Sequence, residues 1–266
     1  MKKLIFFLLA LMIAFAGCKK DKDKDDEEVK GLNPTQTQWG FVYEYTRVNC
    51  GTCGSLGGPL LHELHDMGNV VGVAGHSTGS GGVDPMGISY YNGFYSDRPH
   101  DGGIPFFWVC NTSCARDAAL AKSTMTSFKS QTPIAGVDLS YTISGGKMNV
   151  KTKTKFFAAG TGDYLISVYV LEDNIDGGTN AGAYKQSGGS ADYKHMCVLR
   201  DVSASNVYGE TLAASPAKDA IFEKDFEFTL DAGWIVGNTH PAVVIWNMDF
   251  TANPSHVFIN AKEVRN

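Results

Sequence analysis

Short apolar runs and polar stretches alternate in the first part of the chain in a way that predicts both strands and helices. The β-branched and aromatic run 38–48 predicts a strand. Within 53–67, Leu60, Leu61 and Leu64 recur at helical spacing and predict a helix after it. The apolar run 69–74 then predicts a buried strand.

The pattern continues after a stretch that lacks periodicity. Residues 75–103 are rich in Gly, Asp, Pro and Ser and predict a long loop. Residues 104–109 predict another strand, and the Ala-rich segment 114–129 predicts a second helix. The order of these elements favours a compact α/β unit.

Beyond a junction at 131–136 the pattern changes to runs dense in β-forming residues, separated by Gly, Asp and Asn turns. No helical pattern and no internal repeat accompanies these runs. Six or more strands without helices favour an all-β sandwich of the immunoglobulin-like kind. The predicted strands span 137–144, 147–157, 164–172, 222–230, 242–248 and 257–264.

The N-terminal segment has the pattern of a secretory signal rather than of a folded element. Lys2 and Lys3 precede an uninterrupted apolar run at 4–15, which is too short to span a bilayer core of about 30 Å. Small residues then lead to Cys18, as in a bacterial lipobox, where the cysteine is acylated after cleavage. We expect a signal peptide at 1–17 and lipid on Cys18. An ordinary signal peptide with an incidental cysteine is the alternative.

Charge supports attachment through lipid and excludes one class of partner. Residues 19–28 contain no apolar side chain, so we expect 18–34 to be a lipidated, charged tether. The formal net charge of the chain is −5, and loss of 1–17 with its two lysines makes it about −7. An acidic chain is a poor nucleic-acid binder, so we expect no nucleic-acid partner.

The cysteines provide the strongest chemical signal in the sequence. Cys50 and Cys53 form a C-x-x-C motif between a predicted strand and a predicted helix, where the positive end of the helix dipole favours a thiolate. A merely structural disulfide and a zinc site with Cys110 and Cys114 are the alternatives. We expect Cys110 and Cys114 to form a local structural disulfide, and Cys197 to be a buried thiol. We expect no cofactor and no metal.

Three weaker sequence signals are better explained by structure than by catalysis or metal binding. Gly75–Gly79 matches the G-x-S-x-G motif of serine hydrolases, but the residues after it do not favour the required helix. His62 and His65 share a helix face, and surface histidines explain them better than metal ligands do. Residues 173–177 suggest a calcium loop but lack the distal Glu, so a turn is favoured.

Several of these residues together resemble a known family. Glu44, Thr46, the Cys50–Cys53 motif and the Ile104–Pro105 pair resemble a thioredoxin-like fold. The whole chain is similar to the Omp28-related outer-membrane lipoproteins of Bacteroidetes, whose second-domain motifs resemble 195–201 and 207–210. The resemblance implies that Glu44 is a buried acid that assists proton transfer. It also implies that Pro105 is a cis-proline opposite the cysteine pair.

We therefore expect a thioredoxin-like α/β domain at 35–132, followed by a β-sandwich domain at 133–266. The expected function is thiol–disulfide exchange by a lipoprotein of the cell envelope, anchored in the outer membrane and facing the periplasm or the cell surface. Cys50 would be the nucleophile and Cys53 the resolving cysteine, and protein thiols or disulfides would be the partners. The alternative is a binding or structural lipoprotein with a static disulfide, whose sandwich contacts a partner protein or a glycan.

Overall fold

The computed structural model describes residues 31–79 and 83–265, and their secondary structure is mostly β. The first part of the chain contains β1 (Gly40–Thr46), α1 (Gly58–His65), β2 (Val70–His76), α2 (Tyr90–Tyr95), β3 (Phe106–Val109), β4 (Thr112–Ala115) and α3 (Ala118–Lys129). A π-helical turn at Cys53–Gly57 leads into α1.

The second part of the chain contributes strands and, among the described residues, no α-helix. They are β5 (Ala135–Ser144), β6 (Lys147–Phe156), β7 (Asp163–Glu172), β8 (Ile175–Asp176), β9 (Lys194–His195), β10 (Val198–Val202), β11 (Glu210–Ala214), β12 (Ile221–Thr229), β13 (Thr239–Met248) and β14 (His256–Glu263).

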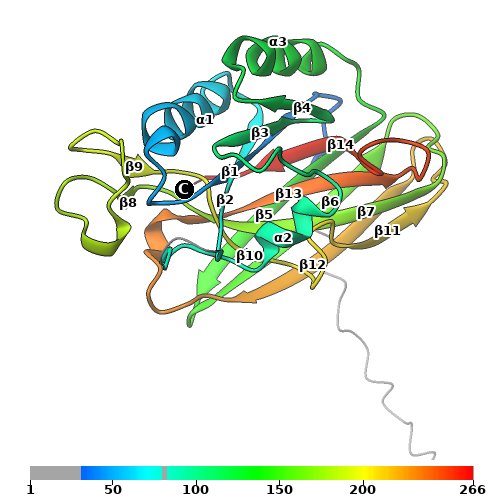
Figure 1. Cartoon of the computed structure of the whole chain (residues 1–266). Coiled ribbons are helices and arrows are strands. Elements are labelled where there is room, and N and C mark those ends of the chain that lie inside the picture. Colours follow the sequence, from blue (N-terminus) through cyan, green and yellow to red (C-terminus); the bar gives the residue numbers. More distant parts are fainter. Residues whose placement is uncertain (1–30, 80–82, 266) are drawn as a thin grey trace, which may run out of the picture.

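One mixed, nine-stranded sheet runs through both parts of the chain. Its strand order is β14-β13-β7-β10-β2-β1-β3-β4, with β11 paired to β7. The joint lies between β2 and β10, where Val198 is in register with Ala74 and the Ala74 N–H donates to the Cys197 carbonyl at 2.7 Å. The α1 and α3 helices lie on the same side of β1, β3 and β4 (Figure 1).

This topology corrects the expected fold class. A thioredoxin-like α/β domain followed by an immunoglobulin-like sandwich is wrong, because a single sheet contains strands of both expected units and the described residues form only three α-helices. The physical reason is that β2 without β10 would leave a row of unpaired backbone groups at a sheet edge. The division of the chain at residues 132 and 133 stays a prediction.

Two hydrophobic cores share the strands of the large sheet. The smaller sheet, with strand order β12-β6-β5, packs through its apolar face onto β7, β11 and β13. Side chains alternate along β7, so Ile166 and Val168 enter this sandwich core, whereas Leu165 and Tyr169 enter the core that α1, α2 and α3 cover. Both faces of β7 are therefore buried.

Most of the predicted elements exist, with informative differences. The runs at 38–48, 69–74 and 104–109 form β1, β2 and β3, and the Leu-rich stripe forms α1. The expected loop at 75–103 contains α2, whose Tyr91 and Phe94 are buried. The expected helix at 114–129 begins only at Ala118, because Asp117 caps it by accepting a hydrogen bond from the Leu120 N–H at 2.9 Å.

Candidate functional site

The C-x-x-C motif lies between the end of β1 and the helical turn before α1. Cys50 and Cys53 form a disulfide, with their Cα atoms 5.2 Å apart. Cys50 is partly exposed, whereas Cys53 is fully buried. The Cys53 N–H donates to Cys50 Sγ at 3.1 Å, so a backbone amide at the start of the helix would stabilise a thiolate on Cys50.

Pro105 lies beside this disulfide, where the resemblance placed it. The Ile104–Pro105 peptide bond is cis. The Ile104 carbonyl oxygen is 3.6 Å from Cys50 Sγ, and Arg116 Nη1 donates to the Pro105 carbonyl at 3.2 Å. The structure therefore brings the 104–105 segment to the exposed sulfur and fixes it through Arg116.

Glu44 is a buried carboxyl group under the first helical turn. It lies on β1 and is 1% exposed, and among the described residues no group bonds to its Oε1. Burial raises the pKa of Glu44 to about 8, against the opposing effect of a hydrogen bond with Thr46. The carboxyl group therefore exchanges a proton near neutral pH, as a proton acceptor for a thiol requires.

Gly57 explains how the helical turn comes so close to this carboxyl group. A Cβ atom at Gly57 would lie 2.2 Å from Glu44 Oε1 and 3.0 Å from Pro105 Cβ. Any larger residue at Gly57 would therefore displace the acid or the proline. The motif, Glu44 and Pro105 are held together by this close approach.

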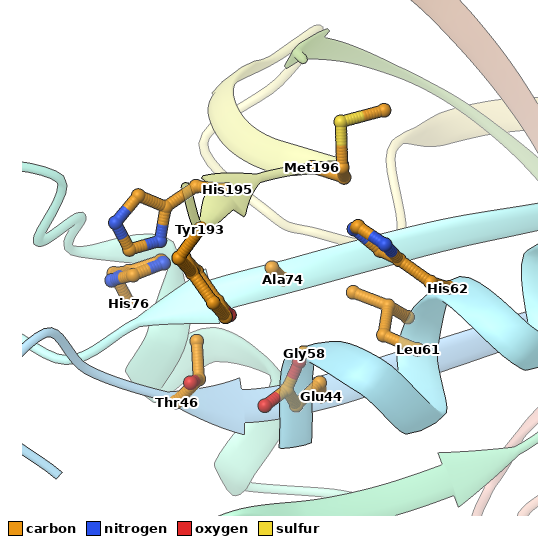
Figure 2. A pocket seen from close by; sticks show the side chains of 10 residues that line it. All are labelled: Glu44, Thr46, Gly58, Leu61, His62, Ala74, His76, Tyr193, His195 and Met196. Atoms are coloured by element: carbon orange, nitrogen blue, oxygen red, sulfur yellow. The ribbon is translucent and has the colours of Figure 1, made fainter. Parts of the chain in front are cut away.

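A small cavity adjoins Glu44, and the buried carboxyl group is one of its walls (Figure 2). It has room for about one water molecule. Its lining is unusually rich in histidine for so small a space. The lining residues are Glu44, Thr46, Gly58, Leu61, His62, Ala74, His76, Tyr193, His195 and Met196.

Two of these histidines form buried polar contacts that sequence reasoning did not anticipate. His76 Nδ1 is 2.9 Å from Asp84 Oδ2, which also accepts the Val48 N–H two residues before Cys50. His195 Nε2 is 2.8 Å from the Tyr184 carbonyl oxygen, and burial lowers the pKa of His195 to about 4. No local sequence pattern pairs His76 with Asp84, so the sequence did not indicate this contact.

A segment from the second part of the chain covers the motif. We call residues 186–193 the covering loop; it precedes β9, beside α1 (Figure 1). Gln186 Nε2 donates to the Cys50 carbonyl at 3.0 Å and to the Arg47 carbonyl at 3.2 Å. Gly188 adopts φ +73°, and a Cβ atom there would lie 2.1 Å from the Gly51 carbonyl oxygen. Nothing in the sequence around Gln186 indicated this contact.

The other described cysteines are free thiols, which corrects the expected Cys110–Cys114 disulfide. Cys110 lies at the β3–β4 turn with φ +52°, and burial raises the pKa of its thiol to about 12. Cys114 Sγ instead lies 3.7 Å from the Thr112 carbonyl oxygen and 3.9 Å from Thr124 Oγ1. Cys197 is buried as expected, with its Sγ 3.4 Å from Arg265 Nη2.

The expected lipidation site lies in a part of the chain that the structure does not describe. Cys18, the signal segment 1–17 and most of the tether lie outside the described residues. Within 31–79 and 83–265, no helix has the length and apolar character needed to cross a membrane. In the same ranges, no three His, Cys, Asp or Glu side chains are placed to share a metal ion.

Comparison with known proteins shows that the fold of this chain is similar to solved structures. No protein-family model and no curated protein matches the chain. HBP35 of Porphyromonas gingivalis is similar with a TM-score of 0.68 at 20% identity, over 87% of this chain and 76% of that one. Protein AGR_C_4864 from Agrobacterium tumefaciens is similar with a TM-score of 0.55 at 13% identity, over 87% and 96%.

A domain of the outer membrane lipoprotein Omp28 from Porphyromonas gingivalis also matches, over 50% of this chain and 88% of that one. Its TM-score is 0.33 at 12% identity. At these identities, the first two likenesses establish a shared fold. The chemistry has to be argued from the residues of this chain.

Proposed function

We propose that this chain is a lipoprotein of the cell envelope that exchanges thiols and disulfides with protein substrates through Cys50 and Cys53. The observation that carries the proposal is the close grouping around this pair. The partly exposed Cys50 sulfur lies next to the cis-proline segment, and Gly57 brings the helical turn against Glu44. A disulfide with a purely structural role requires neither a buried acid nor an exposed first sulfur.

The proposed exchange begins on reduced protein with the Cys50 thiolate. It attacks a substrate disulfide, one substrate sulfur leaves as a thiolate, and Cys50 is joined to the substrate in a mixed disulfide. Cys53 then transfers its proton to the Glu44 carboxylate. The Cys53 thiolate attacks Cys50 Sγ, forms the internal disulfide and releases the second substrate thiolate. The same steps in reverse oxidise a substrate dithiol.

The proposed roles follow from the burial of each group. Exposure suits Cys50 for attack on a large substrate, whereas burial restricts Cys53 to resolving the mixed disulfide. The pKa of Glu44, about 8, lies close to the usual range of a thiol, which favours proton transfer between them. Pro105 would border the groove in which the substrate backbone lies.

The proposed location in the cell envelope rests on the sequence. The apolar segment before Cys18 and the charge block after it favour an acylated, tethered protein, and the net charge favours no nucleic-acid partner. Membership of the Omp28-related group is part of this proposal. Intact-mass analysis of protein from native membranes should show acyl chains on a mature chain that begins at Cys18. A soluble, unmodified mature chain would contradict it.

Trapping of mixed disulfides tests the exchange reaction. Cys53→Ala should accumulate mixed disulfides through Cys50, because the resolving thiol is missing, whereas Cys50→Ala should form none. Cys197→Ala is the matched control, since this thiol is free, buried and outside the motif, and it should behave as the parent protein does. The measurement is mass mapping of the adducts after acid quenching. Equal trapping by the two variants of the motif would refute the assigned roles.

A static disulfide in a binding lipoprotein is the second candidate, and the covering loop favours it. Gln186 and Gly188 pack against the backbone of the motif, as a permanently closed disulfide allows. The reduction potential of the Cys50–Cys53 pair separates the candidates. A value below about −300 mV indicates a structural disulfide, and a higher value indicates exchange. In the candidate with a static disulfide, the sandwich would contact a partner protein or a glycan.

A further inference from the structure

Two neighbouring cavities share one wall next to the motif. The small cavity at Glu44 and a wider pocket open to solvent are both lined by Gly58, His62 and Tyr193. These three residues therefore lie between the cavity at Glu44 and the outer pocket. The remaining residues of the outer pocket are Pro59, Ser190, Asp192 and Lys194.

His62 contributes the imidazole of this wall. Gly58 has no side chain, and a Cβ atom there would lie 1.9 Å from Tyr193 Oη, so the phenol fills that part of the wall. Burial, together with the charge of Glu44, raises the pKa of Tyr193 well above its ordinary value, so this phenol keeps its proton. His62 comes from α1 and is partly exposed (Figure 2).

The surroundings of His62 favour the neutral form of its imidazole. Burial lowers the pKa of His62, and the nearby acids oppose this effect only in part. The titratable and charged groups that face it are Asp66 and His65 on its own helix, Asp173 and Arg265 from other elements, Glu44 in the inner cavity, and Asp192 and Lys194 in the outer pocket.

The other two histidines of the inner cavity do not reach the outer pocket. His76 is 1% exposed and bonds Asp84, and His195 is 3% exposed and contacts the Tyr184 carbonyl. Neither lines the outer pocket. Among the described residues of the inner cavity, His62 is therefore the side chain that combines an imidazole with contact to the outer pocket.

We propose that His62 transfers protons between Glu44 and solvent. The inference rests on the proposed function in one respect, namely that Glu44 receives the proton of Cys53. That proton passes from the Glu44 carboxyl group, through a water for which the cavity has room, to the neutral imidazole of His62. The imidazolium then releases it into the outer pocket. Only O–H and N–H bonds form and break, and no electrons are transferred between groups.

Proton access to Glu44 can be measured on the oxidised protein without any substrate. A pH jump across about pH 8, the pKa of Glu44, should change the infrared band of its protonated carboxyl group, which Glu44→Gln identifies. His62→Ala should slow this change by about 100-fold, because acid–base transfer by a positioned side chain contributes effects of that size. Added imidazole should restore the rate. Equal rates in the parent protein and His62→Ala would overturn the proposal.

His65→Ala is the matched control on the same helix. His65 Nε2 is 2.7 Å from Glu263 Oε1, and His65 lines neither cavity, so its removal should leave the infrared rate unchanged. If His65→Ala slows the change as much as His62→Ala does, the effect comes from disturbance of α1 and the proposal fails. Imidazole rescue confined to His62→Ala would support the proton path.

A second measurement separates this inference from the proposed function. Decay of the Cys50 mixed disulfide should be slower in His62→Ala than in the parent protein, and imidazole should accelerate it. If the parent protein forms no mixed disulfide but the infrared rate depends on His62, the proton path stands and the exchange reaction does not. If exchange proceeds and neither rate depends on His62, the exchange reaction stands and the proton path is refuted.

Discussion

The half of the molecule covered by helices and the sandwich half bury different kinds of polar group. The first buries ionisable side chains, among them Glu44, His76 and Arg98. The smaller sheet of the sandwich buries hydroxyl groups instead, such as that of Thr152. Burial of an ionisable group costs far more free energy than burial of a hydroxyl unless the group is paired. Chemistry near neutral pH is therefore expected where the ionisable groups are buried.

The largest contrast between the halves should come from removing a buried charge. Arg98 is fully buried, bonds Tyr208 Oη at 3.2 Å and Asp97 Oδ2 at 3.0 Å, and lies over the Trp246 ring. Arg98→Met should lower the free energy of unfolding by about 3–5 kcal/mol, because it leaves Asp97 without this partner. Urea denaturation of the oxidised protein measures the change.

A sandwich variant is the matched control for Arg98→Met. Thr152 is fully buried, and its hydroxyl donates to the Lys224 carbonyl at 3.0 Å. Thr152→Val keeps the shape and should lower the free energy of unfolding by only about 1 kcal/mol. Equal losses in the two variants would break the comparison between ionisable and hydroxyl groups.

A smaller effect should appear in the pH dependence of stability. Burial raises the pKa of Glu44 from 4.5 to about 8, so the folded protein holds one more proton than the unfolded chain between these values. Stability from this carboxyl group is therefore present below about pH 4.5 and is lost as the pH rises to 8. Glu44→Gln should remove this decline, which amounts to about 2–5 kcal/mol.

The measurement is the difference in free energy of unfolding between the parent protein and Glu44→Gln at several pH values. Taking the difference cancels the opposite contribution of His195, whose lowered pKa makes stability rise between about pH 4 and 6.5. Thr152→Val should show the pH dependence of the parent protein. A constant difference between the parent and Glu44→Gln from about pH 5 to about pH 9 would show that Glu44 has an ordinary pKa.

A modest loss of stability should come from a change in the covering loop, together with a clear change in the rate of reduction. Gln186→Ala removes the hydrogen bonds to the Cys50 and Arg47 carbonyl groups and should cost about 1–2 kcal/mol. It should also speed reduction of the Cys50–Cys53 disulfide by a small-molecule thiol, because the backbone of the motif is held less firmly. Gln36→Ala, which removes one hydrogen bond to the Pro133 carbonyl, is the control. An unchanged rate in Gln186→Ala would show that the loop does not protect the disulfide.

Much of the local structure was predictable, because its causes are local. The β-branched run that contains Tyr43 forms β1, and the spacing of Leu60 and Leu64 forms α1. Joining of the two halves was not predictable, because the strand that pairs with Ala74 is more than 100 residues away at Val198. The expected fold class assigned separate sheets to the two sides of the change in sequence pattern, whereas strands from both sides form one sheet.

The candidate site also contains residues that were predictable from the sequence and residues that were not. Cys50, Cys53, Glu44 and Pro105 were named from motif spacing and resemblance, and the structure places them together. Gln186 was missed because it acts through contacts with a distant backbone. The expected Cys110–Cys114 disulfide failed because closeness in sequence does not determine where each thiol points.

The burial of both faces of β7 limits how its sequence can drift over generations. From Tyr164 to Glu172 every position is buried, with alternate side chains serving different cores. A substitution at an even-numbered or an odd-numbered position therefore disturbs the packing of one core or the other, and selection acts against it. Strand β12 differs, because most of its side chains are exposed or half-buried and can vary more freely. Among distant descendants of this fold, β7 should keep a recognisable hydrophobic signature after β12 has lost its own.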